Sequence, residues 1–175
     1  MSTKLVKGTA VVSLADGAKL GTVDHVYLDP ARKEIVGFSF HQGGGLFGSK
    51  ASGLVDVSDV HAFGDDAVTV SDVSTIRSEL ALSAQRDELI ELEDLLKRKV
   101  LTEGGVFVGQ IVSVRFGHDS YRLTGIEVSP GFFKDNRVLP ADSVRQIGSE
   151  LVVVSDAVCA PPRERPVERH LVRVA

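Results

Sequence analysis

Short runs of alternating large apolar and small or polar residues dominate the first part of the chain. In residues 35–40, Val36, Phe38 and Phe40 alternate with Gly37 and Ser39, which places the three large side chains on one face of a strand. The other strand-like runs are residues 9–14, 22–28, 54–57 and 67–70. Turn-forming pairs such as Asp16-Gly17 and Asp29-Pro30 separate them. Five short strands are too few for a two-sheet sandwich, so the pattern favours a small, partly open β-barrel.

The stretch from Leu20 to Phe38 returns later in the chain as residues 108–126. Leu-Gly-Thr-Val at its start corresponds to Val-Gly-Gln-Ile, and Ile-Val-Gly-Phe at its end corresponds to Leu-Thr-Gly-Ile. A second match pairs residues 60–72 with residues 144–156 without a gap. A repeat of this length predicts two similar folded units, with glycines recurring where the backbone needs special geometry.

The polar residues of the second copy indicate which face of each strand meets water. Arg115 and Glu127 fall where the first copy has Tyr27 and Ser39, and charged side chains are expected on the solvent side. We therefore expect an inward-facing set and an outward-facing set of residues. The inward set is Val26, Leu28, Val36, Phe38 and Phe40, and the outward set is His25, Tyr27 and Ser39.

Between the two copies the apolar residues change to helical spacing. The residues that recur at this spacing are Ile76, Leu80, Leu89, Leu92, Leu95 and Leu96. We expect an amphipathic α-helix that buries its apolar face on one or both barrels or on another chain. The predicted organisation is a first domain at 1–73, a helical linker at 74–98, a second domain at 99–158 and an extended tail at 159–175 containing Pro and Arg. Alternation in residues 167–174 fits either a docked edge strand or a disordered segment.

Composition places the chain among soluble globular proteins. Hydrophobic residues make up 43% of it and charged residues 25%, which is enough apolar surface for a core. A formal net charge of −4 argues against a general affinity for nucleic-acid backbones. The single cysteine, Cys159, excludes an intrachain disulfide, and no apolar run approaches the roughly 20 residues that cross a bilayer. We expect a cytoplasmic protein without a membrane span.

No motif predicts catalysis, a cofactor or a metal. The histidines are spread along the chain at His25, His41, His61, His118 and His170, without a paired carboxylate or a second ligand at metal spacing. Gly48-Ser49-Lys50 has the wrong order for a phosphate-binding loop and precedes a strand. Asp and Ser pairs lie where turns use them for backbone hydrogen bonds.

Two apolar pairs in loops are the candidate partner-binding residues. Leu46-Phe47 and Phe132-Phe133 follow the third strand of each copy at matching positions. Each pair either folds back to plug an open barrel end or forms an exposed patch that a partner or a second copy covers.

The combination of these features resembles the PRC-barrel domain, here in tandem. The resemblance rests on Gly17-x-x-x-Gly21-x-Val23, on Ile35-Val36-Gly37 and on Gly64-Asp65-Asp66-x-Val68-x-Val70, and it covers about residues 5–73 and 95–158. In the second copy Gly104 replaces Asp16, Gly117 replaces Asp29, and the loop before the fourth strand is four residues shorter. The resemblance implies a mainly β protein, with two partly open five-stranded antiparallel barrels joined by a helix. Such barrels occur in the cytoplasmic part of the photosynthetic reaction centre H subunit, in a ribosome-maturation factor and in stand-alone prokaryotic proteins.

Family resemblance and composition together lead to two functional hypotheses. PRC barrels mostly bind partners and are not known for catalysis, which implies a non-enzymatic scaffold or adaptor for an unknown protein partner. The alternative is an RNA- or ribosome-associated protein, favoured by Lys97-Arg98-Lys99 and by the tail arginines. A homodimer is compatible with both hypotheses, because open barrels have edge strands to cover.

Overall fold

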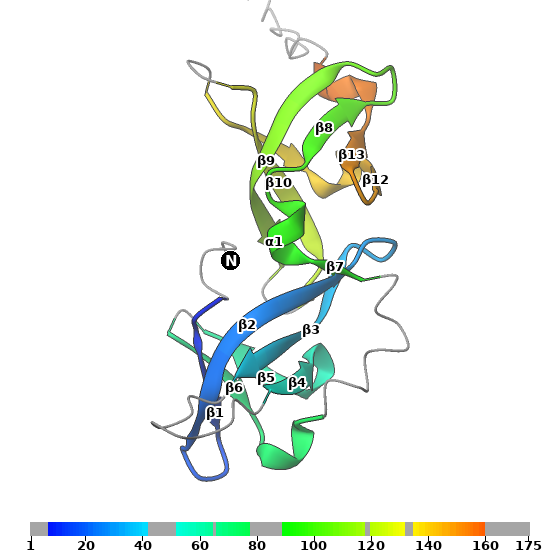
Figure 1. Ribbon diagram of the computed structural model, residues 1–175. Coiled ribbons are helices and arrows are strands. Elements are labelled where there is room, and N and C mark those ends of the chain that lie inside the picture. Colours follow the sequence, from blue (N-terminus) through cyan, green and yellow to red (C-terminus); the bar gives the residue numbers. More distant parts are fainter. Residues whose placement is uncertain are drawn as a thin grey trace, which may run out of the picture.

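A computed structural model of the chain contains two curved β-sheets, one after the other along the chain (Figure 1). It describes residues 7–41, 52–64, 66–77, 89–117, 120–131 and 135–159. In the first sheet the strands are β1 (Ala10–Ser13), β2 (Lys19–Asp29), β3 (Glu34–His41), β4 (Ser52–Asp56), β5 (Val60–Phe63), β6 (Ala67–Val70) and the short β7 (Ile90–Glu91). In the second they are β8 (Lys99–Thr102), β9 (Phe107–Phe116), β10 (Leu123–Ser129), β11 (Arg137–Pro140), β12 (Val144–Ile147) and β13 (Leu151–Val154). The mainly β fold predicted from the sequence is confirmed.

Both sheets have the same strand order. The first runs β4-β3-β2-β1-β6-β5, with β7 added to β2, and the second runs β11-β10-β9-β8-β13-β12. A short 3-10 turn connects the two end strands of each sheet, at Val57–Asp59 in the first and Ala141–Ser143 in the second. A further 3-10 turn follows β6 in the first sheet, at Val73–Thr75, and β13 in the second, at Asp156–Cys159. The sequence repeat therefore corresponds to a repeat of topology.

The number and direction of the strands differ from the prediction of five antiparallel strands per unit. Among the described residues, the first sheet has seven strands, with β7 added from the linking segment, and the second has six. Val60–Phe63 and its counterpart Val144–Ile147 also form strands. Bulges between Val60 and Ala62, and between Val144 and Gln146, break the strict alternation that marks a strand. One pair in each unit is parallel, β1 with β6 and β8 with β13, a pairing between distant segments that local patterns do not reveal.

The linking segment contains much less helix than predicted. In the described part of 74–98, the only α-helix is α1 (Leu92–Leu95), while Ile90–Glu91 pair with Tyr27 and Leu28 of β2. Residues 78–88, with Leu80, lie outside the described residues. Leu92 and Leu95 are buried, so the apolar spacing reflects a single helical turn packed beside β2. Among the described residues, no helix is long and apolar enough to cross a bilayer.

Most predicted core positions are buried, and two of the predicted solvent positions are buried as well. In the first sheet, four of the predicted core residues are at most 5% exposed: Val26, Leu28, Phe38 and Phe40. Val36, the fifth, is only half-buried.

Tyr27 and Ser39, which were expected to face solvent, are each 3% exposed. Bulges between Val23 and His25 and between Tyr27 and Leu28 in the β2–β3 pairing shift the alternation, and β7 pairs beside Tyr27. The hydroxyl of Ser39 accepts a hydrogen bond from the amide of His25 at 3.3 Å. Partly buried His25 lies between the two classes.

The repeated glycines Gly21 and Gly109 lie where two strands approach closely. A Cβ on Gly21 would overlap the carbonyl oxygen of His41 on β3, and one on Gly109 would overlap that of Ser129 on β10. Gly109 also has a φ of 152°. Any larger side chain would push these hairpins apart, which explains why the repeat keeps glycine at this position.

Candidate functional site

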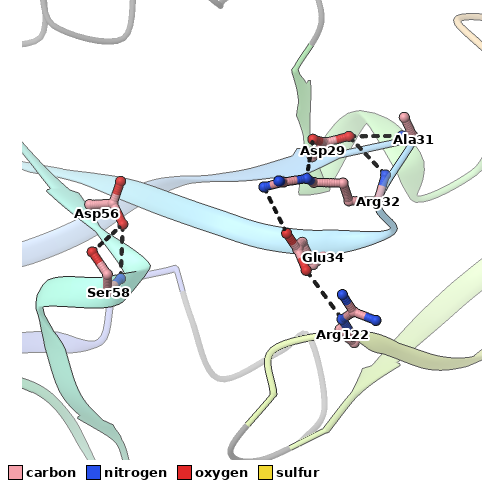
Figure 2. A network of polar contacts seen from close by, with 7 residues as sticks. All are labelled: Asp29, Ala31, Arg32, Glu34, Asp56, Ser58 and Arg122. Atoms are coloured by element: carbon pink, nitrogen blue, oxygen red, sulfur yellow. Dashed lines mark hydrogen bonds and ion pairs between the residues drawn. The ribbon is translucent and has the colours of Figure 1, made fainter.

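The turn between β2 and β3 is held in shape by Asp29. One carboxylate oxygen of Asp29 accepts hydrogen bonds from the amides of Ala31 at 2.8 Å and Arg32 at 3.0 Å (Figure 2). Its carbonyl accepts a third from the amide of Lys33 at 2.8 Å, and Lys33 adopts a positive φ of 56°. This turn presents the side chains of Arg32 and Lys33 at the end of the first sheet.

Backbone hydrogen bonds attach the same turn to the second sheet. The amide of Ile35 donates to the carbonyl of Tyr121 at 2.9 Å, and the amide of Leu123 donates to the carbonyl of Lys33 at 2.7 Å. The ammonium of Lys33 donates to the carbonyl of Val144, at the start of β12. Buried residues of the two sheets belong to one hydrophobic cluster. The units therefore meet in a specific, hydrogen-bonded junction.

Glu34 joins two arginines across this junction. Its carboxylate lies 3.3 Å from Nη1 of Arg32 and 3.3 Å from Nε of Arg122 in the second sheet (Figure 2). The side chain of Glu34 is 19% exposed, whereas those of Arg32 and Arg122 are 70% and 68% exposed. One carboxylate thus orients two guanidinium groups whose remaining donors stay open to solvent.

A cleft of about 510 Å³ opens beside these arginines. Its basic lining residues are Arg32, Lys33, Arg122 and Arg145, its acidic one is Asp142, and its apolar ones are Leu123, Ala141 and Val144. Arg145 pairs with Glu103 at 3.4 Å. Guanidinium groups bind carboxylates and phosphates through paired hydrogen bonds, so the cleft is suited to an anionic group. None of the lining residues is a Ser, Cys or His that could act as a nucleophile or proton carrier.

A second cleft, of about 640 Å³, lies beside the basic run of residues 97–99. Its lining includes all three basic residues together with Asp94 and Glu150. Arg98 is engaged within the protein, because its Nε donates to the carbonyl of Asp94 at 3.0 Å and its Nη1 donates to the carbonyl of Gly148. Arg98 therefore has fewer donors open to a ligand, and the carboxylates of Asp94 and Glu150 offset part of the positive charge of the run.

The four residues predicted to bind a partner lie outside the described residues. Leu46 and Phe47 fall within residues 42–51, and Phe132 and Phe133 fall within residues 132–134. Whether these pairs plug the barrels or form a patch stays a prediction. The junction arginines were missed by the sequence analysis, because only the folded chain brings Arg122 to Glu34.

His25 has carboxylate neighbours that its sequence position does not reveal. Nδ1 lies 3.1 Å from the carboxylate of Glu91 on β7, and Nε2 lies 3.4 Å from that of Asp24. This corrects the expectation that no histidine has a paired carboxylate. In the described ranges, no group of three or more His, Cys, Asp or Glu side chains could hold a metal ion. His118 and His170 lie outside those ranges.

Comparison with known families assigns the second unit. The family model of the PRC-barrel domain matches residues 87–158, from just before β7 to the 3-10 turn after β13. This part of the chain is similar to the PRC-barrel domain. The PRC-barrel match includes β7 and α1, which the sequence analysis placed in the linker, and the first sheet has the strand order of the matched one. No curated protein matches the chain.

Proposed function

We propose that the protein is a non-enzymatic adaptor that binds an acidic segment of a partner protein in the cleft between its two units. A PRC-barrel domain suggests a protein-interaction module, and the equal strand order of the first sheet supports a divergent second copy of that domain. The observation that carries the proposal is the pair Arg32 and Arg122, oriented by Glu34 and still largely exposed beside the cleft.

Charge around the cleft favours a carboxylate-bearing peptide over RNA. The lining contains Asp142, and the arginines already have Asp29, Glu34 and Glu103 as neighbours. A phosphate backbone brings many closely spaced charges, and it would meet these acids as well as the arginines. A short acidic segment needs only one or two carboxylates to reach the exposed guanidinium groups.

A pull-down from the native cell with the full chain as bait tests the proposal. The informative variant is Arg32→Ala/Arg122→Ala, which removes both cleft guanidinium groups. Arg115→Ala is the matched control, because Arg115 is also an exposed arginine but does not line the cleft. Its guanidinium pairs with Glu127 at 3.9 Å. A partner retained by the wild type and by Arg115→Ala, but lost by the double variant, is expected.

Two other outcomes would contradict the proposal. Equal recovery of all partners by the double variant would place binding away from the cleft. The RNA hypothesis is tested by fluorescence anisotropy with a labelled single-stranded RNA at low and high salt. Salt-dependent RNA binding that disappears in the double variant would show that the cleft binds RNA and would contradict the proposed protein partner.

A further inference from the structure

Strands β4 and β11 occupy the same place in the two sheets. In the first sheet Gly37 pairs with Asp56 and Ser39 with Leu54. In the second, the residues equivalent to Gly37 and Ser39 in the repeat, Gly125 and Glu127, pair with Pro140 and Val138. The two strands therefore have equal register, and Val138 is the counterpart of Leu54.

The outer edge of β4 is occupied by the chain itself. The amide of Leu54 donates to the carbonyl of Arg77 at 3.0 Å, and the amide of Arg77 donates to the carbonyl of Leu54 at 2.8 Å. Ile76, the preceding residue, packs partly buried against the core. Leu54 is consequently only 3% exposed. The first unit shows that this position of the fold accepts an additional extended segment.

The outer edge of β11 has no such cover within the described part of the chain. β11 is an edge strand of its sheet, and Val138 on this strand is 50% exposed. The carbonyl of Leu139 faces Gly125 on β10, where an added Cβ would lie 2.9 Å from it. Because successive residues of a strand direct their backbone groups to opposite sides, the N–H and C=O of Val138 point outward, as those of Leu54 do.

The sequence offers a reason why the described part of the chain does not complete β11 as it completes β4. In the ungapped repeat of residues 60–72 and 144–156, continued by five residues, Arg77 corresponds to Pro161. Proline has no amide hydrogen, so Pro161 cannot donate the bond that Arg77 donates to Leu54. A segment that donates this hydrogen bond has to come from another part of the chain or from another molecule.

We propose that β11 pairs with β11 of a second copy of this chain, antiparallel about a two-fold axis at Val138. Each Val138 then donates its amide hydrogen to the carbonyl of the other copy's Val138, and the two exposed valines cover one another. Shifting the register so that residue 136 faces residue 138 would set Arg137 directly opposite Arg137 of the other copy, which is unfavourable. In the proposed register Leu139 faces Arg137, whose guanidinium donates to the carbonyl of Val158 in its own chain at 2.6 Å.

Sedimentation equilibrium of the full chain and of two valine variants tests this interface. Val138→Asp places two carboxylates at the two-fold axis and is expected to weaken dimerisation at least tenfold. Val112→Asp is the matched control, because Val112 is also an exposed valine, at 44%, but lies on β9 inside the sheet. Circular dichroism melting shows whether each variant is folded, and the control is expected to dimerise as the wild type does.

Cross-linking tests the same contact without perturbing the charge at the edge. In a Cys159→Ser background, Val138→Cys is expected to give a dimer with a short bis-maleimide, while Val112→Cys gives none. A monomeric wild type would overturn the proposal, as would a dimer that Val138→Asp leaves intact. If the chain dimerised only after residues 160–175 were deleted, the tail would be the segment that covers β11, and the proposal would be wrong. The proposal would also be wrong if β11 bound a different protein while the chain stayed monomeric.

Discussion

The ring of Phe63 in β5 packs edge-to-face against the ring of Tyr121, which lies between β9 and β10 of the second sheet. Their centroids are 5.1 Å apart and the rings are inclined by 72°. Phe63 also contacts Phe38 at 5.9 Å, in the core of the first sheet. Through these three rings the core of one unit reaches the surface of the other, so the stability of the two units is coupled at the junction.

A double-mutant cycle measures this coupling. Phe63→Leu and Tyr121→Ala are each expected to destabilise the protein, and their combination to show a coupling free energy of about 0.5–1.5 kcal/mol, typical of an aromatic pair. Urea unfolding of the four proteins provides the measurement. Tyr121→Phe, which keeps the ring, is expected to preserve the coupling. Strictly additive effects would mean that the two rings do not stabilise the junction.

The ion pairs of Glu34 are expected to add little to stability despite their central position. Both arginines are exposed, so Glu34→Gln should lower the free energy of unfolding by only about 1 kcal/mol at low salt. Because salt screens exposed pairs, the loss should shrink in 1 M salt. Glu127→Gln, which removes one long pair with Arg115, is the control and should cost less. A loss that is independent of salt would show that packing, and not charge, determines the effect.

Gly21 and Gly109 are expected to be among the least replaceable positions in the chain. Alanine at either site would collide with a backbone carbonyl of the neighbouring strand, which cannot move without opening the hairpin. Each substitution should cost about 3 kcal/mol, at the upper end of the range for overpacked sites. Gly148→Ala is the control, because its Cβ would lie 3.2 Å from the nearest atom, the carbonyl oxygen of Leu151. Thermal melts in which Gly21→Ala and Gly148→Ala lose equal stability would contradict this reasoning.

Strand positions and much of the core could be predicted from the sequence because alternation is a local property. The spacing of Phe38 and Phe40 alone predicts a buried strand face, and the apolar residues Ile126 and Val128 at the equivalent positions support this prediction. Tyr27 was predicted to be exposed but is buried, since a bulge in its pairing with β3 and its pairing with β7 depend on tertiary structure. The helical spacing of apolar residues also led to the prediction of a long helix, whereas residues 90–95 form a short strand and one helical turn.

The candidate site could not be predicted for a related reason. Lys33 and Val144 are 111 residues apart in the chain, and Glu34 meets Arg122 only after both sheets have formed. Neither copy of the repeat contains the cleft by itself, so comparing the copies could not find it. The edge at Val138 is the opposite case, because the comparison with Leu54 reveals it once the register of both sheets is known.

Asp156 links the end of the second sheet to its beginning. Hydrogen bonds from the side chain of Thr102 and from the amide of Gly104, the latter at 2.9 Å, lower the pKa of Asp156 below its ordinary value of 3.8. The carboxylate therefore stabilises the folded state fully above the unfolded pKa, and this contribution is lost as the pH falls through the lower folded pKa. Asp156→Ala should melt at a lower temperature than the wild type at pH 7, and the difference should shrink below about pH 4.

Asp156→Asn separates the hydrogen bond from the charge. The amide oxygen of asparagine can still accept from Gly104, so this variant should retain part of the stability at pH 7. Its difference from Asp156→Ala should not change with pH, because neither side chain titrates. Melting curves between pH 2.5 and 7, a range set about the ordinary carboxyl pKa, check both expectations. A wild type that keeps its full advantage over Asp156→Ala at the lowest pH would show that the ionised carboxylate is not what holds the end of the sheet.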